Sequence, residues 1–244
     1  MSITSAVLAL LVWGVPAPAA HAQAADECVV VLHGLARSAG SMTPIARRLK
    51  AEGYHVANVD YPSRQAPIEA LASTYVPQGV EACRDAGATR IHFVTHSLGG
   101  ILVRHYLKGH TLPDLGRVVM LAPPNQGSEV VDDWKDVIGY AWLNGPAGQQ
   151  LGTDDHAVPL QLGPVTYPVG VIAGTRTVNP ILSQSLPNPD DGKVSVARTK
   201  VEGMTDHIAV PHSHTFIMRV SAVQDQVLHF IRHQVFRHDS DELP

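Results

Sequence analysis

The chain has 244 residues, of which 45% are hydrophobic and 16% charged, and its formal net charge at pH 7 is −4. This length is enough for one α/β domain with a full hydrophobic core, and the composition is that of an ordinary globular protein. The acidic balance and the lack of a basic cluster argue against nucleic acid as a partner. The 14 histidines show no spacing typical of metal ligands, so we expect no metal and no cofactor.

The start of the chain has the pattern of a signal peptide, although it lacks the usual Lys or Arg. Residues 6–15 form an apolar core that is too short to span a bilayer. Helix-breaking Pro16 and Pro18 follow, and then A-H-A, residues 20–22, a small-x-small cleavage site. We therefore expect residues 1–22 to be removed and the mature domain, residues 23–244, to be periplasmic or secreted.

Strand and helix patterns alternate from residue 28 onward. We expect strands over residues 28–32, 54–60, 91–94, 117–121, 169–174 and 207–210. We expect helices over residues 41–52, 68–86 (interrupted or kinked near Pro77), 101–108 and 220–236. Apolar strands that alternate with helices predict an α/β fold with a mostly parallel, doubly wound sheet flanked by helices.

The segment T-H-S-L-G-G, residues 95–100, lies between an expected strand and an expected helix. A sharp strand–turn–helix passage raises its central serine above the sheet, which is the layout of a nucleophile elbow with the pattern G-x-S-x-G. Thr95 stands at the first position of this pattern, near the largest size that close packing of helix on strand admits. An ordinary strand-to-helix turn is the alternative interpretation of so short a motif.

Two further segments agree with the elbow. The first expected strand ends in H-G-L, residues 33–35, and L-A-P-P-N-Q-G-S, residues 121–128, follows the strand after the elbow. In their order and spacing these motifs resemble the α/β-hydrolase superfamily, specifically its bacterial lipase and esterase branch, from about residue 28 to about residue 236. The resemblance implies the α/β-hydrolase fold, a serine nucleophile and an ester or lipid-like small molecule as substrate.

Residues 127–163, called the insertion below, do not fit the alternating pattern. Apolar residues recur there at helical spacing from Val130 to Trp142. In the lipases that the chain resembles, this segment often forms a small cap or lid over the site, and Trp134 and Trp142 would then wall an apolar acyl pocket. The alternative is a short crossover helix with both tryptophans in the core.

The resemblance also implies a catalytic triad. A serine hydroxyl needs a base within hydrogen-bond reach, and the base needs an orienting acid. In the superfamily these residues follow the order serine, acid, histidine. Ser97 would be the nucleophile, and the D-G-x-V segment at residues 191–194 assigns the acid to Asp191, with Asp190 as the alternative. Asp206 lies too close to the last expected strand to be preferred.

The base would be a histidine after the last strand. His214 is followed by T-F-I-M, which matches the apolar helical start that the superfamily has after its catalytic histidine. His212 and His207 are the alternatives. The oxyanion hole would consist of the backbone N–H groups of Leu35 and Leu98.

The other two histidines of the motifs have structural roles in this interpretation. His33 is expected to form hydrogen bonds that hold its turn, and His96 is expected to shape the elbow. A catalytic part is assigned to neither of them.

We therefore expect an exported serine hydrolase that cleaves carboxylic esters through an acyl-enzyme, with transient contact to lipid surfaces as one further property. A thioesterase or an acyltransferase with the same triad is the alternative within enzymes. A non-catalytic protein that binds a lipid or a partner in the same cleft is the alternative of another class. It would show a lost triad residue, whereas every triad position here is occupied.

Cys28 and Cys83 are the only cysteines. Cys28 begins the first mature strand, and Cys83 lies near the end of the helix before the elbow strand. Helices of a doubly wound sheet run antiparallel to its strands, and the strand order of the superfamily makes these two strands neighbours. We therefore expect a disulfide at the sheet edge opposite the site. Two buried free thiols are the alternative.

Overall fold

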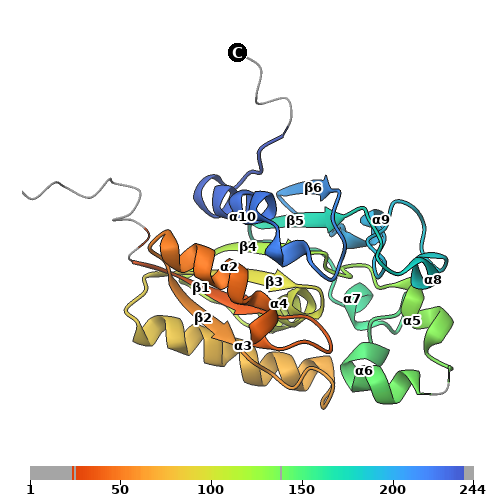
Figure 1. Cartoon of the computed structure of the whole chain (residues 1–244). Helices are drawn as coiled ribbons and strands as arrows, with labels where there is room; N and C mark the ends of the chain where they lie inside the picture. The colour runs from red at the N-terminus through yellow and green to blue at the C-terminus, as the bar shows by residue number, and fades with distance from the viewer. Residues whose placement is uncertain (1–23, 25, 138, 239–244) are drawn as a thin grey trace, which may run out of the picture.

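The centre of the protein is a six-stranded sheet, seen in a computed structural model that describes residues 24, 26–137 and 139–238 (Figure 1). Its strands are β1 (Glu27–Leu32), β2 (His55–Val59), β3 (Arg90–His96), β4 (Leu115–Leu121), β5 (Val169–Gly174) and β6 (Asp206–Val210). They lie in the order β2-β1-β3-β4-β5-β6, and every neighbouring pair is parallel. The predicted doubly wound sheet is confirmed. The expected signal peptide lies outside the described residues.

Helices cover both faces of the sheet, as Figure 1 shows. Helices α3 (Ile68–Asp85) and α4 (Leu98–Gly109) pack on one face, and α2 (Ala39–Ala51) and α10 (Ser221–His233) on the other. Each face of the sheet has its own apolar core. In β1, Cys28, Val30 and Leu32 pack into the core under α3 and α4, whereas Val29 and Val31 pack into the core under α2 and α10. A strand buried on both faces has a continuous apolar run, which is the pattern that predicted it.

Several boundaries differ from those predicted. Helix α4 begins at Leu98, directly after Ser97, and not at residue 101. Helix α3 runs unbroken past Pro77. Helix α10 ends at His233, because Gln234 has a left-handed backbone with φ of 65° that cannot continue the helix. Phe236 still packs against α10, so its apolar character reflects burial and not helical position.

The insertion contains α5 (Glu129–Trp134), α6 (Tyr140–Gln149) and α7 (Val158–Gln161), beyond the carboxyl ends of the strands (Figure 1). The helical spacing therefore belongs to two helices, since α5 ends at Trp134 and α6 begins at Tyr140. Trp142 is 84% exposed, so it is not the core residue of the crossover alternative. The short elements α8 (Pro180–Ser183), α9 (Val196–Thr199) and η1 (Ile217–Arg219) follow β5 and β6. None of the helices in the described ranges is long and apolar enough to cross a membrane.

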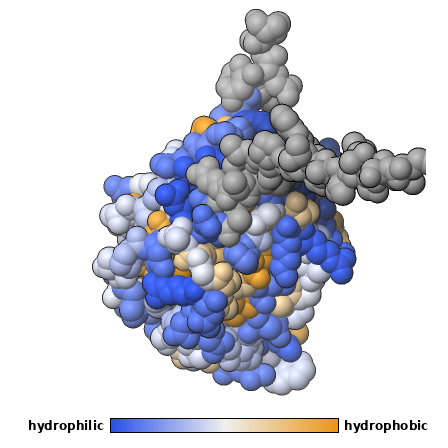
Figure 2. All heavy atoms as spheres, turned by 90° about the vertical axis from the view of Figure 1, so that its left-hand side faces the viewer, coloured by the Kyte–Doolittle hydropathy of each residue, from blue (hydrophilic) through white to orange (hydrophobic). Residues whose placement is uncertain are grey.

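A disulfide joins Cys28 of β1 to Cys83 of α3, with the two Cα atoms 5.5 Å apart. The predicted bridge is thus present, at the edge of the sheet where the strands begin. Figure 2 looks onto that side of the molecule, where hydrophilic residues predominate and a few apolar ones lie near the middle. The bridge closes a segment with a sequence separation of 55 residues. It lies at the opposite edge from the loops that follow the strands.

Replacing both cysteines by alanine is expected to lower the free energy of unfolding by roughly 2–4 kcal/mol, because the unfolded chain regains the entropy of an open loop. Urea unfolding of the wild type and of the Cys28→Ala/Cys83→Ala variant measures this difference. An unchanged midpoint would contradict it. Mass spectrometry of the unfolded, non-reduced, iodoacetamide-treated protein checks the bridge itself, since two alkylated cysteines would rule it out.

Candidate active site

Ser97 connects β3 to α4 with a strained backbone. Its φ of 51° and ψ of −121° lie in a region that L-residues rarely occupy and that costs on the order of 1–3 kcal/mol. The backbone N–H of Ser97 donates to the carbonyl of Leu121 at the end of β4, at 2.9 Å. The turn is thereby fixed between two strands, and the serine is placed at the first turn of a helix at the carboxyl edge of the sheet.

Two glycines allow the close packing around Ser97: Gly99 in α4 and Gly34 in the turn after β1. A Cβ on Gly99 would lie 2.8 Å from the carbonyl oxygens of both Leu32 and His33, because α4 crosses directly over the end of β1. A Cβ on Gly34 would lie 2.7 Å from the ring of His96. A side chain at Gly99 would push α4 away from β1, and one at Gly34 would displace the ring of His96.

Thr95 fits at the first position of the elbow because of its neighbour. The Thr95 hydroxyl is buried without a hydrogen-bond partner among the described residues, and it lies 3.2 Å from the place a Cβ on Gly100 would take. Gly100 therefore supplies the space that threonine occupies. The departure from G-x-S-x-G is compatible with a tight elbow.

His214 and Asp191 form a buried pair next to Ser97. The ring Nδ1 of His214 donates to Oδ2 of Asp191 at 2.8 Å. The other carboxylate oxygen of Asp191 accepts the backbone N–H groups of Lys193 at 3.0 Å and Val194 at 2.8 Å. Since Asp191 is 1% exposed, these three donors satisfy a carboxylate that water hardly reaches. The pairing leaves Nε2 of His214 free for another partner.

The alternative residues lie elsewhere. Asp190 is buried too, but its carboxylate accepts from the N–H of Gly192 and the hydroxyl of Ser183, both at 2.7 Å, so it holds the loop in shape. His207 contacts the hydroxyl of Thr199 at 3.0 Å. The carboxylate of Asp191 bonds to the ring of His214 and not to that of His212 or His207. The structure therefore brings Asp191 and His214 together, and Ser97 lines the same cavity as His214.

Two backbone N–H groups lie beside the serine without an acceptor among the described residues. One belongs to Leu98, the first residue of α4, where helix geometry leaves amides unpaired. The other belongs to Leu35, in the turn that follows β1. Free amides at a helix start favour a negatively charged oxygen. These are the two groups that the family resemblance assigns to the oxyanion hole, and that role stays a prediction.

His96 fixes the backbone of His214. Its Nε2 donates to the backbone carbonyl of His214 at 2.9 Å, while its Nδ1 is buried without a partner among the described residues. Burial, and after it the nearby charge of His214, holds the pKa of His96 well below its ordinary value. His96 is therefore neutral and fixes the position of His214 relative to the elbow.

His33 stabilises the turn after β1, as its position in the motif suggested. Its Nδ1 donates to the carbonyl of Gly34 at 2.8 Å, and its Nε2 accepts the N–H of Tyr61 at 3.3 Å. The ring stacks on that of Tyr61 with centroids 4.0 Å apart. Burial lowers the pKa of His33, so the ring stays neutral.

A narrow cavity of about 100 Å³ opens beside Ser97 and His214. Its walls are mostly apolar, formed by Leu35, Pro124, Val130, Val131, Leu151 and Val194. Val130, Val131 and Leu151 belong to the insertion, which therefore supplies much of the apolar wall. Neither Trp134 nor Trp142 lines this cavity. Arg37 and Lys193 line the same cavity. We call this the serine cavity.

Sequence reasoning missed the contacts that anchor the insertion. The buried guanidinium of Arg104 donates to the carbonyls of Asn125 at 2.9 Å and Gly163 at 2.7 Å, and burial lowers its pKa to about 10. The hydroxyl of Ser128 donates to the carbonyl of Lys193 at 2.6 Å. The one available signal was an arginine inside the apolar stretch of α4. Its partners lie 21 and 59 residues away, beyond any local pattern.

Among the described residues, no group of three or more His, Cys, Asp or Glu side chains is placed to hold a metal ion.

Comparisons with known proteins place the chain in one family through a family model. A family model described as the alpha/beta hydrolase family matches residues 29–224. Curated proteins gave no match. The chain is similar in structure to the mature lipase BlEst2 of Bacillus licheniformis, with a TM-score of 0.65 and 18% identity over 86% of this chain and 92% of that one.

Two further solved structures are similar. One is phospholipase PlaB from Legionella pneumophila, with a TM-score of 0.68 and 17% identity over 87% of this chain and 60% of that one. The other is a lipase-esterase related protein from Clostridium acetobutylicum, with a TM-score of 0.54 and 14% identity over 85% and 96% of the two chains. At these identities the likeness shows a shared fold.

The neutral state of His96 predicts a loss of stability in mild acid. Because its pKa is lowered in the folded state, the unfolded chain binds more protons below the ordinary histidine pKa, and stability falls as the pH drops. Between pH 7 and 5, one such histidine costs up to about 2 kcal/mol. Urea unfolding at both pH values is expected to show a smaller loss for His96→Asn than for the wild type.

The matched control is His55→Asn, because His55 is exposed on β2. This variant is expected to lose as much stability between pH 7 and 5 as the wild type does. An unaltered acid loss in His96→Asn would contradict the assignment of a neutral, buried ring.

Proposed function

The chain belongs to the alpha/beta hydrolase family, and on that premise we propose that it is an exported serine hydrolase that cleaves carboxylic esters. The observation that carries the proposal is the hydrogen bond between His214 and Asp191, with Ser97 lining the same cavity as His214. This is the arrangement of base, orienting acid and nucleophile that activates a serine. The lipases and esterases among the structural neighbours support the substrate class.

In the proposed reaction, the Ser97 hydroxyl attacks the ester carbonyl while Nε2 of His214 takes its proton. Asp191 keeps the His214 ring in the required tautomer and stabilises its cation. The carbonyl oxygen becomes negative and is held by the N–H groups of Leu35 and Leu98. His214 then gives the proton to the departing alcohol, which leaves an acyl group on Ser97. A water molecule activated by His214 releases the acid and restores the serine.

The two amides carry much of the expected rate enhancement. Each is already oriented and has no other acceptor among the described residues, so no hydrogen bond must be broken when charge develops. Losing one such donor typically costs a hundred- to a thousandfold in rate. Because both groups belong to the backbone, their orientation depends on the close packing of α4 on β1 and not on the leucine side chains.

The observations favour hydrolysis over the alternatives. The serine cavity meets a larger and more polar hollow at Ala36 and Arg37, which gives water access to an acyl-enzyme. A thioesterase or acyltransferase would use the same three residues with another acyl donor or acceptor. A non-catalytic binding protein would have no use for the strained backbone at Ser97. The disulfide supports export, because such bonds persist outside the reducing cytosol.

Replacing Ser97 by alanine is expected to abolish hydrolysis of p-nitrophenyl esters, with a loss of several orders of magnitude, because the nucleophile is gone. The same variant is expected to lose stoichiometric labelling by a fluorophosphonate. Ser73→Ala, which alters an exposed serine on α3, is the matched control and is expected to keep both. If purified Ser97→Ala kept more than a few per cent of the activity, another nucleophile would be at work.

The neighbouring aspartates provide a second test. Asp191→Asn is expected to lower kcat by about a thousandfold or more, because an amide cannot stabilise the histidine cation. Asp190→Asn keeps an oxygen that can accept from Gly192 and is expected to keep kcat within about tenfold, with its main effect on stability. The reverse ranking in steady-state kinetics with one ester would move the acid to Asp190.

A further inference from the structure

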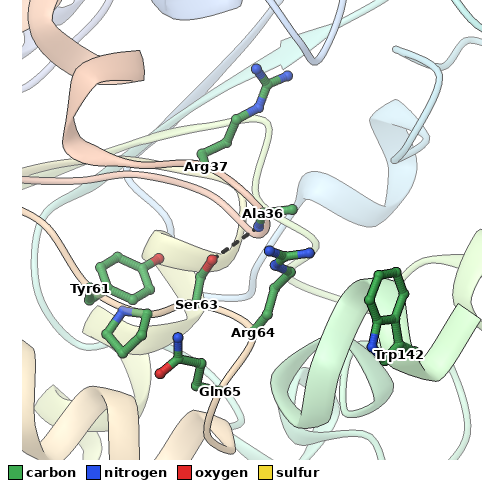
Figure 3. A pocket seen from close by; sticks show the side chains of 8 residues that line it. Ala36, Arg37, Tyr61, Ser63, Arg64, Gln65 and Trp142 are labelled. Carbon is green, nitrogen blue, oxygen red and sulfur yellow. Dashed lines mark hydrogen bonds between the residues drawn. The ribbon is translucent and has the colours of Figure 1, made fainter.

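A second hollow adjoins the serine cavity. It has a volume of about 410 Å³ and shares Ala36 and Arg37 with the serine cavity. Its other lining residues are Tyr61, Pro62, Ser63, Arg64, Gln65 and Trp142. We call it the arginine hollow. Figure 3 shows Arg64 reaching up beside Ala36, with Arg37 above them and Trp142 across from them on α6.

The arginine hollow and the serine cavity together present three cations and no carboxylate in their linings. These cations are Arg37, Arg64 and Lys193, and none of them forms an ion pair within the described part of the chain. Loss of water around its ammonium, and after it the charge of Arg37, lowers the pKa of Lys193, while Asp191 acts in the opposite direction. Arg37 and Lys193 therefore repel each other, and a bound anion would reduce this repulsion.

The insertion is seated firmly against this hollow. A Cβ on Gly145 of α6 would lie 1.9 Å from the backbone carbonyl oxygen of Arg64, so the two segments touch without space for a side chain. The guanidinium of Arg64 also donates to the carbonyl of Leu143 at 3.4 Å. Trp142 on the same helix is mostly exposed and offers a flat apolar face to whatever occupies the hollow. The segments that line the hollow are therefore held against each other by direct contacts.

The two spaces differ in volume and lining, so they suit different parts of a substrate. Pockets that hold small molecules generally measure about 300–1,000 Å³, and the arginine hollow lies in this range while the serine cavity is smaller. The serine cavity has apolar walls, which suit a short acyl chain. The arginine hollow meets the serine cavity in the turn after β1, which also carries the Leu35 N–H proposed to hold the carbonyl oxygen. With the acyl chain in the serine cavity, the alcohol part of the ester would therefore lie in the polar, cationic hollow.

We propose that the arginine hollow binds the alcohol part of the substrate and selects esters whose alcohol carries a carboxylate or a phosphate. Arg37 and Arg64 bind the anion, and Trp142 packs on the group that connects it to the ester. This inference rests on the proposed ester hydrolysis and adds the chemistry of the leaving group. The anion is recognised through charge and paired N–H donors, for which arginine is well suited.

Two pairs of esters test the inference. In the first pair, 4-butyryloxybenzoate and its methyl ester share the acyl group and ring but differ by one negative charge. In the second, 4-(butyryloxy)phenyl phosphate is compared with 4-methoxyphenyl butyrate. Since the phenols within a pair differ in leaving ability, the quantity measured is the ratio of kcat/KM for the anionic ester to that for the neutral one, in each variant relative to the wild type.

The Arg37→Gln/Arg64→Gln variant is expected to lower this ratio roughly five- to tenfold, as two partly exposed ion pairs would. The control, Arg47→Gln/Lys50→Gln, removes two exposed cations from α2 and is expected to keep the wild-type ratio. Adding 0.5 M NaCl, an excess over physiological ionic strength, is expected to reduce the ratio of the wild type. The pair with the larger loss identifies carboxylate or phosphate as the preferred anion.

The outcomes separate this inference from the proposed function. If the wild type hydrolyses both esters of a pair but the double variant keeps the wild-type ratio, the anionic subsite is overturned and ester hydrolysis stands. An equal fall of the ratio in the control variant would also overturn it, because the effect would then follow net charge alone. If the wild type hydrolyses none of the four esters, the proposed function itself fails. Urea unfolding of the double variant shows whether it is folded.

Discussion

The contact between the first turn of α4 and the end of β1 determines where the candidate site residues lie. At Gly99 the helix backbone approaches the carbonyls of Leu32 and His33 more closely than any side chain would allow. Ser97 bears the cost as an unfavourable backbone conformation. This conformation places the side chain of Ser97 beside the unpaired backbone N–H groups of Leu35 and Leu98. This geometry needs buried strands on both sides, since only a close-packed core resists the strain.

Hydrogen bonds fix the positions of His214 and Asp191 relative to the elbow. His96 belongs to the elbow strand and holds the backbone of His214, which follows β6. The backbone N–H of His214 in turn donates to the carbonyl of Asp191 at 3.1 Å, after β5. The end of β3 and the loops after β5 and β6 are therefore joined directly, without relying on the insertion. A neutral imidazole serves this purpose well, because it can be buried without the cost of a charge.

The sequence predicted the parts of the protein that depend on local pattern. Runs such as the one in β1 are apolar at every position, which only a strand buried on both faces requires. The elbow at Ser97 and the pairing of Cys28 with Cys83 followed from motif order and strand order. Asp190 and Asp191 could be ranked only by resemblance, because adjacent residues of the same type differ solely in the direction that the loop gives them.

The insertion could not be predicted in the same way. Its helices are short, and Gly145 and Pro146 interrupt α6, so no single period extends through it. Trp142 is large and apolar, which suggests burial, yet it lies exposed beside a hollow that only the folded chain creates. The arginines of that hollow come from the loops after β1 and β2. Nothing in their local sequence indicates that they line the same hollow.

Arg104 holds the two ends of the insertion together. Its single guanidinium binds the carbonyl of Asn125, just before the insertion, and the carbonyl of Gly163, at its end. Both ends of the segment are thus clasped at one point on α4, within the sheet's own helical layer. The clasp thus marks the boundary between the sheet with its covering helices and the segment that carries α5, α6 and α7. A segment of another length that kept these two carbonyls would begin and end at the same place on α4, but it would have to form new contacts with Arg64 and Lys193.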